Sequence, residues 1–127
     1  MSNFKNLAWI NLVFLTVQFL VGWYVDFSND FPSIFSTNIF LYGGLAFHIV
    51  LGLVVGAIGI ALLIISLKRK TNVRTALISL VFLGISGVTG LLFMISNFLN
   101  NTYSNLMMLF SVLALMSYFY LAIEIEG

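Results

Sequence analysis

The chain has 127 residues, of which 61% are hydrophobic and only 7% are charged. Soluble domains average about 25% charged and roughly 45–50% apolar residues, so this composition excludes both a soluble globular domain and a disordered segment. Five Lys and Arg residues and a net charge of +1 offer no basic surface for nucleic acid. We therefore expect an integral membrane protein that forms a single domain over residues 1–127 and has the lipid bilayer as its first partner.

The charged residues divide the chain into three long uncharged stretches, residues 6–25, 31–67 and 75–123. A membrane-spanning helix needs about 20 mostly apolar residues, so the first stretch predicts one span over about residues 6–25. The charged residues themselves are Lys5, Asp26, Asp30, Lys68, Arg69, Lys70, Arg74, Glu124 and Glu126.

The second and third stretches each contain a segment of turn-forming residues. Residues 31–38 hold the only proline, so we expect a loop there and one span over about 39–67. The third stretch is too long for one helix and has four asparagines between 97 and 105, a residue type that favours turns. It therefore predicts spans over about 75–96 and 104–123. The expected fold class is all-α, a bundle of four transmembrane helices.

All the cations fall at one end of this predicted bundle. Lys5 precedes the first span, and the other four lie at 68–74, between the second and third spans. Because cytoplasmic loops of membrane proteins carry an excess of Lys and Arg, we predict a multi-pass protein of the cell (cytoplasmic) membrane with N-in, C-in topology and a cytoplasmic 68–74 connection. The sequon Asn100-Asn101-Thr102 falls on the predicted outer side.

Each predicted span has one face of small or polar residues, which are the residues that mediate helix packing in lipid. We expect these four faces to line the bundle interior, with Asn11, Gln18 and Ser111 among its polar groups. The faces consist of Asn11, Gln18 and Gly22; Gly44, His48, Gly52, Gly56 and Gly59; Gly84, Gly87, Gly90 and Met94; and Ser104, Met107, Met108, Ser111 and Tyr118.

His48 is the only acid or base predicted inside the membrane. The interior therefore lacks the partners needed for a catalytic dyad or triad, and it lacks the three ligands of a zinc or di-iron site. The absence of cysteine removes thiol chemistry. Three hypotheses remain for His48: a hydrogen bond within packed helices, with Gln18 or Ser111 as acceptor; ligation of haem; or handling of a proton or a substrate.

Haem iron accepts a single His, a His/His pair or a His/Met pair. On the haem hypothesis the cofactor is haem b, with His48 as one axial ligand and Met108 as the candidate second ligand. Gly52, Gly56 and Gly90 leave space for the flat porphyrin. An alternative arrangement is a symmetric dimer in which two copies of His48 share one haem.

The segment Leu45-Ala46-Phe47-His48-Ile49-Val50-Leu51-Gly52 resembles the histidine helix of small four-helix membrane cytochromes, namely the b561-type cytochromes and the half-units of haem A synthase. The resemblance implies haem b inside the bundle and electron exchange with quinone. Those families use a second histidine on another helix, which this chain lacks, and haem A synthases place Glu before and Arg after a bundle histidine. The resemblance therefore carries over only a ligand role for His48.

Three functions remain as expectations. The first is a protein without catalytic machinery, serving as an accessory or structural subunit of a membrane complex, including a respiratory one, or as a homo-oligomer joined through glycine faces. The second is a haem-binding electron-transfer protein. The third is a small transporter or channel, lined by Asn11, Gln18 and Ser111. The scarcity of reactive groups favours the first.

Overall fold

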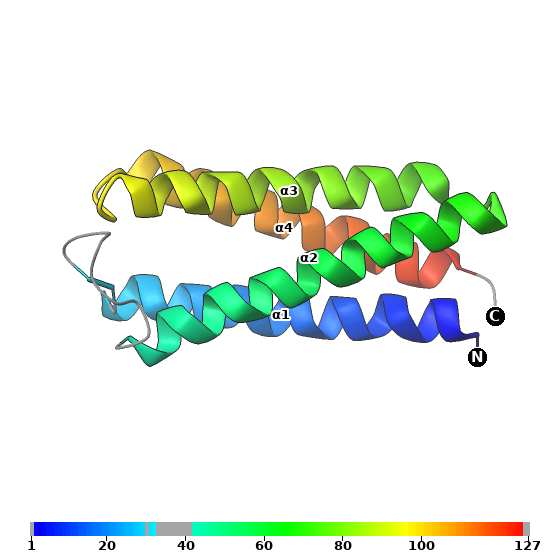
Figure 1. Ribbon diagram of the computed structural model, residues 1–127, viewed down its shortest axis with the longest axis horizontal. Helices are drawn as coiled ribbons and strands as arrows, with labels where there is room; N and C mark the ends of the chain where they lie inside the picture. Colours follow the sequence, from blue (N-terminus) through cyan, green and yellow to red (C-terminus); the bar gives the residue numbers. More distant parts are fainter. Residues whose placement is uncertain (1, 30, 33–41, 126–127) are drawn as a thin grey trace.

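The computed structural model describes residues 2–29, 31–32 and 42–125, and it contains four helices (Figure 1). At 23 to 27 residues and 1.5 Å per residue, each is longer than the roughly 30 Å hydrocarbon core of a bilayer. All four are long and apolar enough to cross a membrane, and the described residues contain no strand. The predicted all-helical fold with four candidate spans is therefore confirmed. The helices are α1 (Asn3–Ser28), α2 (Gly43–Arg69), α3 (Val73–Ile95) and α4 (Asn101–Glu124).

The helix ends differ from the predicted spans by a few residues. α1 continues through Asp26, which therefore lies on its last turn and not in a loop. α4 begins at Asn101, three residues before the predicted start, because the side chain of Asn100 accepts a hydrogen bond from the backbone N–H of Thr102 at 3.1 Å. Such a cap satisfies an N–H that has no partner within the helix. The predicted loop residues 33–38 and the predicted span start at 39–41 lie outside the described residues.

The four helices form a closed ring in which each packs on two neighbours (Figure 1). α1 contacts α2 and α4, and α3 contacts α2 and α4; in the described part of the chain neither diagonal pair has close backbone contacts. Successive helices run in opposite directions, so α1 begins, α4 ends and the α2–α3 turn lies at the same end of the bundle. We call this the cationic end, because it carries Lys5, Lys68, Arg69, Lys70 and Arg74.

The cationic end is closed by a tight turn and a cation–π contact. Lys70 and Asn72 adopt left-handed backbone angles, with φ of 56° and 59°, which lets α3 begin directly after α2. The guanidinium carbon of Arg69 lies 5.3 Å from the centre of the Phe4 ring. Because Phe4 is buried, this contact ties the end of α2 to the start of α1.

Three aromatic rings close the other end of the bundle. Phe31 stacks on Phe98 with ring centres 5.2 Å apart, and Phe93 meets both rings edge-on. Phe98 has a φ of 60°, which is uncommon for a bulky residue. Its ring is nevertheless buried, so the aromatic packing holds the α3–α4 turn in this conformation.

The expected inward face of α3 is correct at Gly90 and Met94, which pack inside the bundle, and wrong at Gly84 and Gly87. Gly84 and Gly87 are exposed, and a Cβ at either would meet no described atom within 4 Å. The buried residues of α3 are two apolar side chains and three hydroxyl residues, and each of these hydroxyls bonds to a backbone carbonyl. These buried residues are Ala76, Ser79, Ser86, Thr89 and Phe93.

Tyr118 of α4 crosses the centre of the ring to reach α2. Its side chain is fully buried, and its hydroxyl oxygen lies against Gly59, where a Cβ would stand only 2.6 Å away. A Cβ at Gly56, one turn earlier, would meet no described atom within 4 Å. Gly59 is thus the position on α2 where the absence of a side chain admits the tyrosine.

We predict that Gly59→Ala destabilises the protein by about 1–3 kcal/mol, because the added methyl overlaps a buried hydroxyl that has little freedom to move. Gly56→Ala is the matched control on the same helix and is expected to leave the melting temperature unchanged or slightly higher. Adding Tyr118→Phe to Gly59→Ala removes the clashing oxygen and should recover part of the loss. Thermal unfolding in detergent measures all three; an equal loss in Gly56→Ala contradicts the explanation.

Candidate functional site

A small cavity lies between α1, α2 and α4, in the half of the bundle away from the cationic end. Its volume is about 30 Å³, enough for one or two water molecules or a single ion. We call it the His48 cavity. The polar, aromatic and sulfur-containing side chains that line it are Phe19, Trp23 and Asp26 of α1, His48 of α2, and Ser104, Met107, Met108 and Ser111 of α4.

His48 is held in place by α1. Its Nδ1 lies 3.1 Å from the backbone carbonyl oxygen of Gln18, and because a carbonyl only accepts, Nδ1 must carry the proton. The Nε2 atom is therefore the nitrogen that keeps a lone pair in the neutral ring. The ring lies against Gly22, where a Cβ would stand 2.6 Å from Cε1. The absence of a side chain at Gly22 is thus a condition for this ring position.

Gln18 makes the reciprocal contact. A Cβ added at Gly52 would stand only 2.8 Å from the side-chain nitrogen of Gln18. The side chain of Gln18 therefore packs against a glycine of α2, just as the ring of His48 packs against a glycine of α1. The hydrogen bond between the two residues uses the backbone carbonyl of Gln18 and not its amide side chain. His48, Gln18 and Gly52 therefore form one interlocked contact between α1 and α2.

Ser111, a predicted interior residue, belongs to a hydroxyl pair between α3 and α4. Its Oγ lies 2.7 Å from Oγ of Ser86, and Ser86 Oγ lies 2.9 Å from the carbonyl oxygen of Met107. Because that carbonyl can only accept, Ser86 donates to it and Ser111 donates to Ser86. Sequence reasoning missed Ser86, although Ser79, Ser86 and Thr89 recur at helical spacing and could have identified this polar face.

Asn11, the third polar residue predicted in the interior, is fully buried, and both polar atoms of its amide lack a hydrogen-bond partner among the described residues. The same holds for the Tyr118 hydroxyl, Oε1 of Gln18 and Oγ of Ser66. An unpaired buried polar group costs about 1–3 kcal/mol. The interior therefore retains polar groups that its own side chains leave unsatisfied.

The residues predicted to hold haem do not surround one large space. A Cβ added at Gly56 would meet no described atom within 4 Å. A Cβ added at Gly90 would stand only 2.9 Å from the sulfur of Met107, which fills that space. Met108 lines the His48 cavity and is 36% exposed. Pockets for cofactor-sized ligands have about 300–1,000 Å³, against about 30 Å³ beside His48. In this arrangement the residues do not fit a porphyrin.

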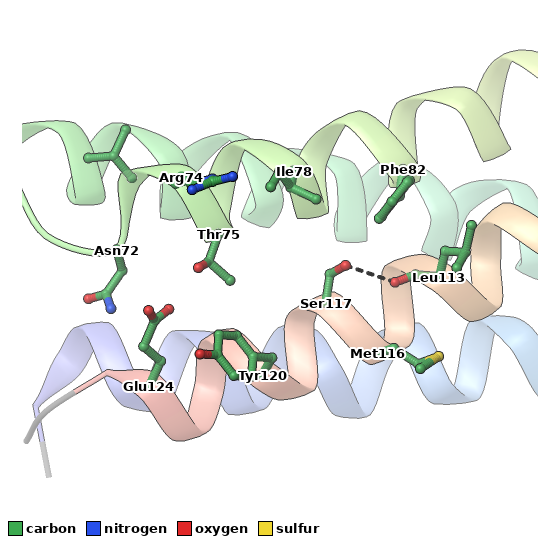
Figure 2. A pocket seen from close by; sticks show the side chains of 11 residues that line it. Asn72, Arg74, Thr75, Ile78, Phe82, Leu113, Met116, Ser117, Tyr120 and Glu124 are labelled. Atoms are coloured by element: carbon green, nitrogen blue, oxygen red, sulfur yellow. Dashed lines mark hydrogen bonds between the residues drawn. The ribbon is translucent and has the colours of Figure 1, made fainter.

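A larger hollow of about 800 Å³ lies between α3 and α4 at the cationic end (Figure 2). Its polar rim includes Asn72, Arg74 and Glu124, whereas Phe82 and Leu113 lie farther along its apolar floor. The hollow is an open groove, and the side chains of Asn72, Thr75 and Glu124 point towards one another at one end of it (Figure 2). It is therefore an amphipathic surface, and the smaller His48 cavity, which is lined by polar side chains from α1, α2 and α4, is the better candidate for a specific site.

No family model matches the sequence, and no curated protein or solved structure is significantly similar to it.

We predict that Ser86→Ala destabilises the protein by about 1 kcal/mol, since it removes both the bond to Met107 and the acceptor of Ser111, and interhelical hydrogen bonds in membranes contribute about 0.6–1.7 kcal/mol. Ser79→Ala is the matched control: Ser79 is also buried on α3, but it bonds only to Thr75 of its own helix. Its loss should be smaller. Chemical unfolding in detergent compares the two, and equal losses would argue against a role for the interhelical bonds.

Proposed function

We propose that this chain is a multi-pass protein of the cell membrane that has no catalytic machinery of its own and acts as an accessory or structural subunit by associating laterally in the bilayer. The absence of catalysis is proposed from the sequence, which has one histidine and no cysteine. Membrane insertion is supported by the outer surface of the bundle, where large apolar side chains are exposed on every helix. Examples are Leu20 (52%), Leu53 (72%), Leu91 (58%) and Leu109 (53%).

The proposed topology is N-in, C-in, with the cationic end in the cytoplasm. The bundle supports it by gathering Lys5 and the four cations of residues 68–74 at one end. Lys and Arg near span ends are retained on the cytoplasmic side.

Because the chain has no cysteine, single cysteines report topology cleanly. We predict that Asn105→Cys, near the start of α4, reacts with a membrane-impermeant maleimide in intact cells, whereas Lys70→Cys in the α2–α3 turn reacts only after the membrane is opened. Both positions are exposed, so access to the reagent decides the result. If only Lys70→Cys is labelled in intact cells, the proposed topology is wrong and the cationic end faces outward.

The observation that supports lateral association is one exposed apolar face of α3. Its residues are spaced alternately four and three apart, as in the seam of a coiled coil, and neither α2 nor α4 covers them. The large side chains are 48% to 64% exposed, and the exposed Gly84 lies in the middle of the seam. We call this the α3 seam: Leu77, Val81, Gly84, Val88, Leu91 and Ile95.

We propose a second copy of the chain as the occupant of the α3 seam. Two parallel copies related by a two-fold axis along the membrane normal place each seam residue against its own counterpart. The seam is uncharged, so this pairing brings no like charges together. Gly84 would meet Gly84 at the centre, where the absence of side chains lets helix backbones approach closely in lipid.

We expect a single cysteine at Gly84 to form a disulfide between two copies under mild oxidation in the membrane, because Cα atoms within about 4.4–6.8 Å can be bridged. Val81→Cys and Val88→Cys should cross-link through the same seam. Ile60→Cys, equally exposed but on α2, is the control and should stay monomeric on a denaturing gel. Equal cross-linking of Ile60→Cys, or none at all three seam positions, contradicts the proposed dimer.

A further inference from the structure

Three side chains with nitrogen or sulfur donor atoms line the His48 cavity: the imidazole of His48 from α2 and the soft thioethers of Met107 and Met108 from α4. Among the metal ions available to proteins, thioether sulfur selects Cu(I), and imidazole is also a good copper ligand. Hard ions such as Mg²⁺ and Ca²⁺ prefer several oxygen ligands instead. The donor set therefore points to a soft, monovalent metal ion.

The cavity has the size that an ion requires. Its volume of about 30 Å³ admits one ion or a water molecule, whereas pockets for organic ligands are about ten times larger or more. Asp26 and Trp23 also line it and are exposed, at its outer side. A carboxylate attracts a cation, and the face of an indole ring adds cation–π stabilisation.

His48 is already oriented as a metal-binding histidine. Histidines that bind metals donate their second ring N–H to a carboxylate or a backbone carbonyl, which fixes the tautomer and the ring position. Here Nδ1 donates to the carbonyl of Gln18 at 3.1 Å, and the ring lies in the space left by Gly22. Nε2 is thereby left as the nitrogen with a lone pair for an ion.

Met107 and Met108 line the cavity from a turn of α4 that a hydrogen bond holds in place, and their side chains are flexible. Ser86 of α3 donates a hydrogen bond to the carbonyl of Met107, which positions this turn of α4. The sulfur of Met107 lies against Gly90, and Met108 is partly exposed. Methionine has three rotatable bonds before its terminal methyl, and on the proposal made below the Met107 sulfur leaves its contact with Gly90 to bind the ion.

We propose that the His48 cavity binds one Cu(I) ion, with Nε2 of His48 and the thioether sulfurs of Met107 and Met108 as ligands. Cu(I) accepts low coordination numbers, so this set suffices where a structural zinc site would need about four ligands. The site does not depend on the α3 seam, because its ligands come from α2 and α4.

The test uses the full chain purified in detergent and titrated anaerobically with Cu(I) in competition with a chromophoric Cu(I) chelator, and with Ag(I) as a probe that does not change oxidation state. We expect one ion per chain. His48→Ala and the double variant Met107→Leu/Met108→Leu should each lower the affinity at least tenfold. Met116→Leu is the matched control: it lies on the same helix but is 65% exposed and does not line the cavity, so its affinity should be unchanged.

A second measurement guards against variants that fail to fold. Ligand binding to the folded state raises its stability by mass action, so Ag(I) should raise the melting temperature of the unmodified chain and of Met116→Leu. Absence of both competition and thermal stabilisation in the unmodified chain overturns the proposal. Undiminished binding in the folded double variant, or tighter binding of Zn²⁺ than of Cu(I), overturns it as well. Cross-linking through Gly84 tests lateral association separately, so either proposal can fail alone.

Discussion

The bundle depends on a single kind of contact, in which a side chain of one helix fills the space of a missing side chain on another. His48 lies against Gly22, Gln18 against Gly52, Tyr118 against Gly59 and Met107 against Gly90. In the bilayer that we propose as the surroundings of the bundle, the hydrophobic effect does not drive helices together, because the lipid tails are as apolar as the helix surfaces. Close packing and interhelical polar contacts must do so, and glycine is the residue that permits both.

These contacts also account for the shape of the ring. α2 runs obliquely, beginning beside α1 and ending near α3 at the cationic end (Figure 1). Its glycines follow that path: Gly52 receives a residue of α1, whereas Gly59 lies near Leu80 and Leu83 of α3 and receives Tyr118 of α4. The tyrosine thus connects a diagonal pair of helices whose backbones lie too far apart to pack.

The same contacts produce the His48 cavity. Because the histidine ring and Gln18 are interlocked with glycines of the opposite helix, the ring has one orientation and one committed nitrogen. Ser86 positions the facing turn of α4 through the carbonyl of Met107. The site is therefore built by helix packing, which binds Nδ1 of His48 and leaves Nε2 with a lone pair that faces no carbonyl partner among the described residues.

The amino-acid sequence by itself determined the number of helices, their approximate ends and the clustering of the cations, because a chain with so few charges must place each of them outside a span or at its end. It also singled out His48, Gln18 and Met108. Only the tertiary structure decided which faces meet. On α3 the sequence favoured the glycine stripe, yet Gly84 faces outward, because in lipid glycine serves an inner and an outer interface equally well.

The volume beside His48 was likewise decided by tertiary packing alone. A glycine marks space along one helix, but the side chain that fills this space comes from another helix whose rotation and tilt the sequence pattern does not specify. Gln18, Tyr118 and Met107 occupy that space here. The space that remains has room for an ion and not for a porphyrin. The spacing of residues along four separate helices could not predict this volume.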